Sequence, residues 1–410
     1  MTISVDMRQV VLVIASAVDL VGVDDVLHGR RVAVMAAAIA KAAGWDRDRQ
    51  DLIFDAGLLH DCGVSSTRAH RHLVEELDWE GAQEHCDLGH ALLAGFEPLA
   101  RLAPIVLHHH THWDRLEALG VEPDVRLAAN LIFLADRVDV NAAPHYGDDS
   151  LLLRLGPTRD LISRHRDVYF APELVDAFLA VSRAEAFWLA LTPDFIRQEV
   201  AARRGCATER SIGLGELRQL GLIIASIVDA KSHFTTDHSL GVARLATLLA
   251  RQLGIVGEHL ERIEVAALLH DIGKLQIPDE LLESRDRLSP EGRALMKKHS
   301  FATWQILRRI GGLEEIALWA SEHHESLDGG GYPFRFFAAE LSLEARIIKV
   351  ADVYQALAQD RPYRGPMAPA DILGVLRGMQ EAHAVESTVV DVVAGHLAEC
   401  HAAALGTRNS

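Results

Sequence analysis

The chain has 410 residues, of which 49% are hydrophobic, 24% charged and only 6% aromatic. This length allows two or three domains with separate cores, and the composition is that of a folded globular protein. The net charge of −17 argues against general binding to DNA or RNA backbones. Any anionic substrate therefore needs a local positive feature, such as metal ions or a few arginines.

The N-terminal apolar run, residues 10–18, ends at Asp19 and is too short to span a bilayer. It also lacks the charged start and the small-residue cleavage site of a secretory signal. The four cysteines show no CxxC pairing, which argues against a disulfide framework and a zinc knuckle. We therefore expect a cytoplasmic protein that does not associate with membranes.

The chain repeats itself, and the polar residues of the two copies pair in chain order. The pairs are His28 with His238, His60 with His270, Asp61 with Asp271, His85 with His299, His109 with His323, His110 with His324 and Asp136 with Asp352. The offset rises slowly, from 210 (238 − 28) through 214 (299 − 85) to 216 (352 − 136). This constant order predicts two copies of one domain, which we place at 1–200 and 201–410.

Most segments between the paired residues have the apolar spacing of helices. In residues 238–254, for example, one helical face carries Val242, Leu245, Leu248 and Leu249. No run shows a convincing alternating strand pattern. The sequence therefore predicts an all-α fold of two tandem helical bundles.

The seven repeated residues of the second copy are imidazoles and carboxylates, which suit divalent transition metals such as Fe, Mn or Zn. Seven ligands are too many for one ion but fit a pair that shares a bridging carboxylate. Adjacent residues such as His323 and His324 diverge by about 100° on a helix and can address different ions. Two-metal sites are typical of phosphoester hydrolysis, because they generate hydroxide and neutralise charge developing on phosphate.

The second copy resembles the HD-GYP family, a branch of the HD superfamily of metal-dependent phosphohydrolases. The matching text is "DHSLGVA", "LLHDIGKLQIP", "KKHS", "HHESLDGGGYP" and "ARIIKVADVYQALAQDRPYRGPM". The resemblance implies a bacterial phosphodiesterase that opens cyclic di-GMP to pGpG, and often to GMP, with water activated by two ions, Fe or Mn. Mixed cyclic GMP-AMP is the alternative substrate. The implied metal ligands are His238, His270, Asp271, His299, His323, His324 and Asp352.

The resemblance also implies the residues that handle substrate. Asp271 bridges the ions, and Lys274 meets the scissile phosphate. The expected substrate contacts are Gly330, Gly331, Tyr332, Arg361 and Arg364. The alternatives are an ordinary exposed lysine, a tight turn and solvated helix-end arginines.

Two positions depart from the family pattern. Some members have a glutamate as a ligand to a third metal four residues before the first ligand histidine, and here that position is Phe234. We therefore expect two metals in this copy. Gln355 stands where the family often has aspartate, which predicts altered hydrogen bonding around the ligands and not a lost ligand.

The first copy keeps all seven ligand types but lacks the parts that handle substrate. Its set is His28, His60, Asp61, His85, His109, His110 and Asp136. Val64 replaces the lysine, and Arg115 follows Asp114 where the glycines would begin. We expect a second metal centre with up to two more ions, in a domain that is regulatory, dimerising, a sensor or a hydrolase of another phosphoester. The alternative is a structural remnant.

Two rival functions remain for the whole chain. One is a non-catalytic signalling module that binds metal or a cyclic dinucleotide, and the other is diiron oxygenase chemistry on the same fold. The intact Lys274 and glycine loop favour phosphodiester hydrolysis. We expect a cyclic dinucleotide as the partner, cyclic di-GMP first, no nucleic acid, and a possible homodimer.

Overall fold

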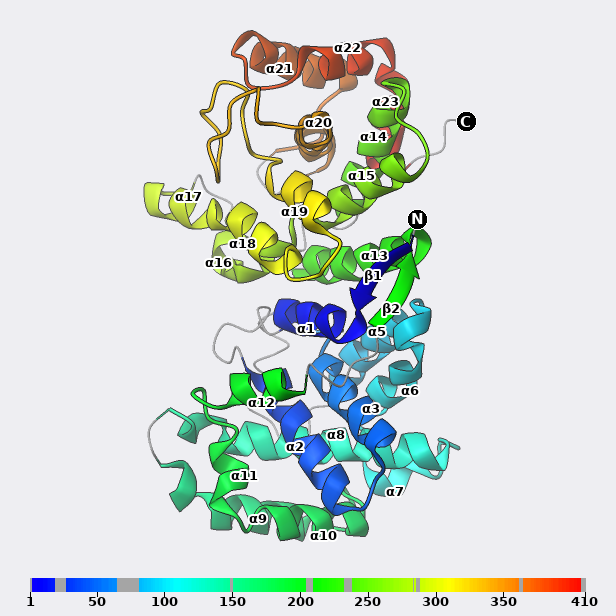
Figure 1. Ribbon diagram of the computed structural model, residues 1–410, viewed down its shortest axis with the longest axis vertical. Helices are drawn as coiled ribbons and strands as arrows, with labels where there is room; N and C mark the ends of the chain where they lie inside the picture. The colour runs from blue at the N-terminus through cyan, green and yellow to red at the C-terminus, as the bar shows by residue number, and fades with distance from the viewer. Residues whose placement is uncertain are drawn as a thin grey trace. The chain divides into compact units, whose positions relative to one another are not determined.

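The computed structural model describes residues 2–18, 27–64, 81–147, 150–203, 209–231, 238–282, 284, 288–360 and 364–406. The chain forms two compact units, an N-terminal unit (Met7–Thr208) and a C-terminal unit (Met1–Asp6 with Glu209–Ser410). Both are built almost wholly of helices, so the predicted all-α class is confirmed (Figure 1). None of the described helices is long and apolar enough to cross a membrane.

The N-terminal unit is a bundle arranged around α2. Its α-helices are α1 (Met7–Val18), α2 (His28–Ala42), α3 (Arg47–Leu59), α5 (Ala82–Ala94), α6 (Ala103–Leu107), α7 (Trp113–Leu116), α8 (Pro123–Ala142), α9 (Leu155–Arg164), α10 (Pro172–Val181), α11 (Glu185–Leu189) and α12 (Ile196–Ala202). Short 3-10 helices are η1 (Glu97–Leu102), η2 (Ala143–His145) and η3 (Leu151–Leu153). Helix α2 packs against α3, α8, α10 and α12, and most of its side chains are buried.

The C-terminal unit repeats this plan around α14. Its helices are α13 (Leu214–Lys231), α14 (His238–Gln252), α15 (Glu258–Leu269), η5 (Ile272–Gln276), α16 (Asp279–Leu282), α17 (Pro290–Met296), α18 (Lys298–Leu307), α19 (Glu314–Ser321), α20 (Leu343–Ala358), α21 (Pro369–Glu381), α22 (Ser387–Gly395) and α23 (Leu397–Leu405). Helix α14 packs against α15, α20, α22 and α23. Of its predicted face, Val242, Leu245 and Leu249 are buried, whereas Leu248 is only half-buried.

The paired residues of the two copies occupy the same places on matching helices. His28 and His238 open α2 and α14, and both helices have 15 residues. His60 and His270 directly follow α3 and α15. The repeat in the sequence is therefore a repeat of helices, with each ligand fixed near a helix end or on a buried face.

The structure contains one pair of strands that the sequence analysis did not predict. β1 (Thr2–Asp6) pairs antiparallel with β2 (Glu209–Gly213), with Thr2 opposite Gly213. Each strand has only five residues, which is too short for an alternating pattern to stand out. The expectation of no strand was wrong here, and the first residues of the chain belong to the C-terminal unit.

One glycine in each unit sets the distance between two ligand-bearing segments. A Cβ atom on Gly63 would lie 2.0 Å from the carbonyl oxygen of His85, and one on Gly273 would lie 1.9 Å from that of His299. Only glycine permits this approach. The glycine of the His-Asp turn therefore brings the turn against the helix that carries the third histidine.

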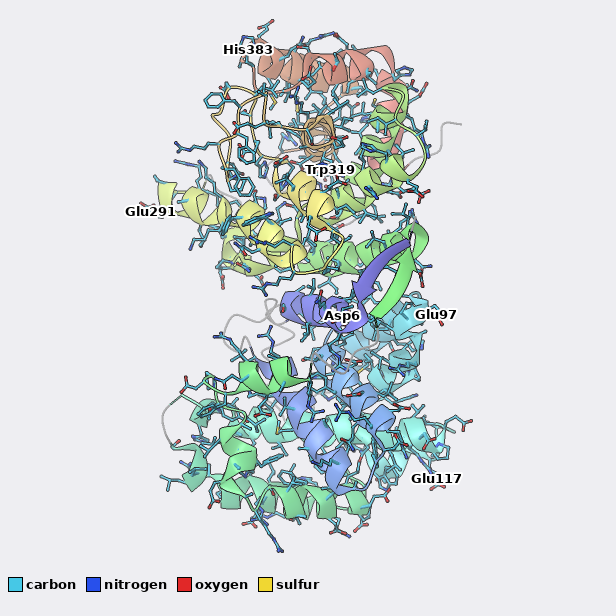
Figure 2. The ribbon with its side chains drawn as sticks, in the orientation of Figure 1. Asp6, Glu97, Glu117, Glu291, Trp319 and His383 are labelled. Carbon is cyan, nitrogen blue, oxygen red and sulfur yellow. The ribbon has the colours of Figure 1, made fainter. Side chains whose placement is uncertain are left out.

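Acidic side chains lie on the outside of both units. Glu97, Glu117 and Glu291 are exposed and project from the ribbon (Figure 2). They contribute to the net charge of −17. Because the exterior is acidic, anions can be attracted only locally, at the buried clusters described below.

Candidate metal centres

The C-terminal unit gathers all seven residues that the sequence analysis named as metal ligands. They come from the start of α14, the turn after α15, α18, the turn after α19, and α20. Six of them are 9% exposed or less, and His324 is half-buried. Asp229 on α13 helps to fix the start of α14, because its carboxylate accepts hydrogen bonds from the backbone and hydroxyl of Ser239 at 3.2 and 2.9 Å.

Asp271 lies between two groups of histidines. Its Oδ2 atom is 3.1 Å from Nε2 of His270 and 3.5 Å from Nε2 of His238. Its Oδ1 atom is 3.6 Å from Nε2 of His299 and 3.8 Å from Nε2 of His323. One carboxylate thus offers one oxygen to each group, which is the arrangement that a bridging ligand requires.

The two groups have geometry suited to ions. His238, His270 and Asp352 present ligand atoms within 4.8 Å of one another, as do His299, His323 and His324. Side-chain nitrogens of His238 and His270 (both Nε2) and Oδ1 of Asp271 are buried without a hydrogen-bond partner among the described residues. Such orphaned polar atoms are costly unless something binds them. The residues therefore fit a pair of divalent ions.

Hydrogen bonds at the outer ring nitrogens orient these histidines. The Nδ1 atoms of His270, His299 and His323 donate to the carbonyl three residues earlier, at 2.7, 2.6 and 2.7 Å. A carbonyl can only accept, so Nε2 is left with its lone pair toward the centre. His238 bonds instead to the side-chain amide oxygen of Gln355.

Electrostatics keep the carboxylates of the cluster ionised. Burial opposes this, but His270 and Lys274 hold the pKa of Asp271 well below its ordinary value. Burial lowers the pKa of His238, yet the Asp271 and Asp352 carboxylates, 3.5 and 3.4 Å from its Nε2 atom, outweigh burial and raise the pKa to about 9. The cluster therefore favours bound positive charge.

Lys274 lies at the edge of the cluster. Its Nζ atom pairs with Oδ2 of Asp271, and its side chain is 22% exposed. It is therefore not an ordinary surface lysine. A half-exposed ammonium held beside the shared carboxylate is placed to meet a substrate oxygen; that contact itself remains a prediction.

The glycine loop after His324 is anchored by two charged residues that the sequence analysis did not name. Glu325 is 1% exposed, and its carboxylate accepts hydrogen bonds from the backbone of Phe334, Arg335 and Phe336 at 2.6, 3.1 and 3.2 Å. Lys349 on α20 donates to the carbonyl of Glu325. Both residues stand inside the quoted family text, so their position was visible, but the fold was needed to show their contacts.

The loop requires glycine where it passes close to other atoms. A Cβ atom on Gly331 would lie 2.4 Å from Cα of Glu325, and one on Gly330 would touch the Asp328 carboxylate at 3.1 Å. Tyr332 packs against His324 with ring centroids 4.8 Å apart. The structure thus brings Tyr332 to the cluster, while contacts of these residues with substrate remain predictions.

An aromatic cluster extends from this loop to α18. Phe334 lies 5.6 Å from Trp304, 6.3 Å from Phe301 and 5.1 Å from Phe336, measured between ring centroids. Phe301 is 45% exposed and follows His299 by two residues. This surface was not predicted from the sequence, because the four residues come from two separate segments.

The arginines of the "RPYR" text differ in what the structure says of them. Arg361 lies outside the described residues. Arg364 donates to the carbonyl of Ala356 at 2.6 Å, one helical turn after Asp352, and contacts the sulfur of Met367. In this structure Arg364 therefore holds the end of α20, and its contact with substrate remains a prediction.

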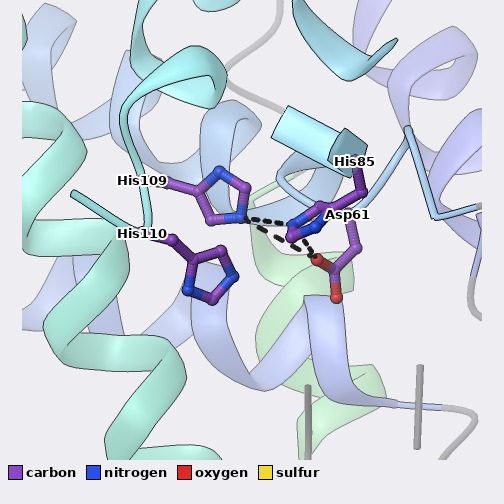
Figure 3. Close-up of side chains that lie close together, drawn as sticks. All are labelled: Asp61, His85, His109 and His110. Carbon is purple, nitrogen blue, oxygen red and sulfur yellow. Dashed lines mark hydrogen bonds and ion pairs between the residues drawn. The ribbon is translucent and has the colours of Figure 1, made fainter. Parts of the chain in front are cut away.

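The N-terminal unit assembles a second cluster from its own set. Asp61, His85, His109 and His110 place ligand atoms within 4.8 Å of one another, and the four side chains converge in Figure 3. Oδ1 of Asp61 is 3.5 Å from Nε2 of His85, and the Nε2 atoms of His85 and His109 are 3.2 Å apart. His28, His60 and Asp61 form another such group.

Two buried arginines distinguish this cluster. Arg137 contacts Oδ2 of Asp136 through Nε and a terminal nitrogen, at 3.0 and 2.7 Å. Arg31 contacts both oxygens of Asp139 at 2.8 and 3.0 Å, and Asp139 also accepts from Nδ1 of His28 at 2.8 Å. At the offsets of the repeat, Gly241 of the C-terminal unit matches Arg31, and Val353 matches Arg137.

The substrate-handling parts are absent from the described residues of this unit. Val64 stands where Lys274 stands, Thr111 where Glu325 stands, and Phe133 where Lys349 stands. No glycine loop follows His110, and His112 instead stacks on Tyr169 with centroids 3.9 Å apart. The ligand positions are thus kept without the loop anchor.

Comparisons with known proteins agree with this architecture. Models of a family described as HD domain match residues 26–141 and 222–389. A 3′3′-cGAMP-specific phosphodiesterase from Vibrio cholerae is 36% identical over 397 residues, which cover 95% of this chain and 91% of that protein. The chain belongs to the HD-GYP family. It is a phosphodiesterase of cyclic dinucleotides, so the resemblance is confirmed and the non-catalytic alternative is set aside.

Other matches to this HD-GYP protein are more partial or more distant. A cyclic di-GMP phosphodiesterase response regulator from Xanthomonas campestris is 40% identical over 143 residues, covering 34% of this chain and 38% of that protein. A solved structure of a cyclic GMP-AMP specific phosphodiesterase from Vibrio cholerae superposes with a TM-score of 0.62 at 23% identity, covering 99% of both chains. The structural likeness supports the fold.

Proposed function

We propose that the C-terminal unit of this HD-GYP protein hydrolyses 3′3′-cyclic GMP-AMP in preference to cyclic di-GMP. The observation that carries the choice is the coverage of the relatives. The relative named for 3′3′-cGAMP matches 95% of the chain and so includes both units. The cyclic di-GMP phosphodiesterases from Xanthomonas campestris and Pseudomonas aeruginosa match 34% and 47% of it.

Cyclic di-GMP is the second candidate. The motifs that led the sequence analysis to it, including the glycine loop and Lys274, lie in the C-terminal unit alone. Both substrates are purine cyclic dinucleotides with the same phosphodiester bonds. The geometry of the metal cluster therefore supports either substrate, and the relative that covers both units favours the mixed one.

The chain's own residues supply most of the proposed chemistry. His238, His270 and Asp352 form one binding group, His299, His323 and His324 form the other, and Asp271 joins them. Two divalent ions held there supply a nucleophile from water and neutralise charge on the phosphate. Lys274 stabilises the negative charge that develops on phosphorus-bound oxygen as the P–O bond to the 3′ oxygen breaks. The product is a linear dinucleotide.

The aromatic cluster supports a substrate with purine bases. Stacking of a base on an aromatic ring contributes about 1–3 kcal/mol. Phe301, Trp304 and Phe334 offer such rings beside Tyr332, which packs on His324. Glu325 and Lys349 keep the loop that carries two of these aromatic rings in place. We assign base binding to this surface.

The N-terminal unit binds metal in this proposal but does not hydrolyse the dinucleotide. Its cluster keeps the ligand types, whereas the lysine and the glycine loop are replaced by Val64 and by the His112–Tyr169 stack. Because Val64 stands in the place of Lys274, this unit has no lysine at that position to stabilise negative charge on the phosphate. Its role is regulatory or structural.

The test is turnover of both dinucleotides by protein loaded with Mn²⁺ or Fe²⁺, with products separated by chromatography. We expect kcat/KM for 3′3′-cGAMP to exceed that for cyclic di-GMP at least about tenfold. Asp271→Ala removes the shared ligand and lowers turnover by about 10³-fold, since a metal contributes several kcal/mol to the transition state. Asp391→Ala, an exposed aspartate paired with Arg377 on the surface, is the control and retains turnover.

Each result decides one part of the proposal. No turnover of either dinucleotide by fully loaded protein overturns the assignment of catalysis to this cluster. Equal rates, or faster turnover of cyclic di-GMP, overturn the substrate preference and leave the second candidate. Full activity of Asp271→Ala would place catalysis elsewhere in the chain.

A further inference from the structure

The two clusters differ in how evenly their ligands divide between two ion positions. In the C-terminal unit each position has its own trio, one of which includes the unshared carboxylate of Asp352. In the N-terminal unit one position has four ligands, Asp61, His85, His109 and His110. The other group consists of His28, His60 and the shared Asp61. Asp136, the match of Asp352, lies outside this group, although its Oδ1 atom is 3.3 Å from Nε2 of His28.

Arg137 binds the Asp136 carboxylate at its other oxygen. Its guanidinium contacts Oδ2 of Asp136 at two points, and both side chains are 2–3% exposed. Two contacts at 3.0 and 2.7 Å between buried groups of opposite charge are the geometry of an ion pair. At the matching position Val353 has no charge, and Oδ1 of Asp352 lies 3.4 and 3.8 Å from Nε2 of His238 and His270.

The charge at this position argues the same way. A fixed guanidinium beside Asp136 already neutralises the carboxylate that a second ion would need. The charge of the remaining carboxylate, Asp139, is matched by Arg31. A second divalent ion would therefore lie near two buried guanidiniums, whereas the C-terminal unit has a single ammonium, Lys274, whose side chain is 22% exposed. Burying unmatched charge of one sign costs several kcal/mol.

We propose that the N-terminal unit holds one divalent transition-metal ion, bound by Asp61, His85, His109 and His110, whereas the C-terminal unit holds two. The inference rests on the proposed metal binding by both clusters and goes beyond it in assigning their stoichiometry. Three imidazoles and one carboxylate suit Fe, Mn or Zn. The guanidinium of Arg137 supplies the positive charge that a second ion would otherwise supply beside Asp136.

The experiment counts metal per chain by elemental analysis, after loading the full chain with Mn²⁺ and removing excess ion by desalting. We expect about three ions per chain in the natural protein, about two in Asp61→Ala and about one in Asp271→Ala. Arg137→Val, which installs the residue of the matching position, raises the count to about four. Arg137→Met, of similar length without charge, is the second variant, and circular dichroism checks that each variant is folded.

Electron paramagnetic resonance gives a readout independent of activity. In Asp271→Ala the remaining Mn²⁺ gives the six-line signal of an isolated ion, because no neighbour is close enough to couple to it. A count of four ions per chain in the natural protein would overturn the single-ion assignment. A count of two that stays the same in Asp61→Ala would also overturn it. An unchanged count in both folded Arg137 variants would show that Arg137 does not set it. All of these outcomes are separate from turnover, so they stand whether or not the proposed substrate is correct.

Discussion

The two clusters of predicted metal ligands occupy matching positions in the fold but differ in the residues that surround them. In both, one aspartate lies between two groups of histidines, and His60 and His109, like His270 and His323, donate Nδ1–H to the carbonyl three residues earlier. Helix ends fix these positions in the same way twice. The repeated fold therefore preserves the orientation of the imidazoles. The charged residues around them differ between the two units.

The two units differ in the residues that contact Nδ1 of the first histidine, His28 or His238. In the N-terminal unit His28 donates to Asp139, which Arg31 and Tyr146 also contact. In the C-terminal unit His238 bonds to Gln355, and no side chain fits where Arg31 stands, because a Cβ atom on Gly241 would lie 2.5 Å from a backbone carbonyl. A buried charged network in one unit thus replaces a neutral amide in the other.

The largest expected effect tests this replacement through stability. Asp139→Ala removes the carboxylate that pairs with the buried guanidinium of Arg31, which costs about 3–5 kcal/mol. Gln355→Ala removes one neutral hydrogen-bond acceptor and costs about 1–2 kcal/mol. The measurement is hydrogen exchange of α2 and α14 in metal-free protein as a function of urea, which reports each unit separately.

Asp139→Asn serves as the matched control. It keeps an acceptor for His28 but not the charge for Arg31, so we expect an intermediate loss. Equal losses for Asp139→Ala and Gln355→Ala would contradict the view that the two units stabilise their first histidine by different means.

It was predictable that these imidazoles and carboxylates lie together, because they repeat in order along the chain. Each ligand stands at a fixed place on a helix, so spacing in the sequence translates directly into spacing in the fold. The second layer was not predictable in this way. Arg137 is adjacent to a ligand, but nothing in the sequence says that its guanidinium turns back onto Asp136. Likewise, Phe301 and Phe334 meet only through the packing of the loop on α18.

The strand pair and the division of the chain also depended on tertiary structure. Five-residue segments have little pattern of their own, and β1 pairs with a strand more than 200 residues away (213 − 2 = 211 for Thr2 and Gly213). The substrate contacts of Arg361 and Arg364 were carried from family resemblance. The fold gives Arg364 a backbone contact instead, at the end of α20.

The second prediction concerns the cation that only one unit has. Lys274→Ala should lower kcat about 10²-fold with little change in KM, since the ammonium acts on charge that develops in the transition state. Metal content should stay the same, which separates this role from metal binding. Steady-state kinetics and elemental analysis of the same sample measure both quantities.

Val64→Ala, at the matching position, is the control and should leave kcat within a factor of about two. A loss of metal in Lys274→Ala would instead show that the lysine positions Asp271 for metal binding. Unchanged kcat would remove it from catalysis.

The smallest expected effect lies on the aromatic surface, where α18 and α5 differ most. Phe301 and Trp304 on α18 match Asp87 and His90 on α5, so this pair of aromatic rings is found only on the helix of the C-terminal unit. Phe334→Ala should raise KM about tenfold at nearly constant kcat, because loss of one stacked base costs about 1–3 kcal/mol.

The Phe334 side chain can be removed without releasing the loop, because Glu325 holds the backbone N–H and not the ring. Phe334→Tyr keeps a ring and should restore KM to within about twofold. Phe195→Ala, a 49% exposed phenylalanine of the N-terminal unit, controls for loss of an exposed ring. If Phe334→Ala left KM unchanged for both dinucleotides, the bases would have to bind away from this surface, and the contrast between α18 and α5 would then be one of packing alone.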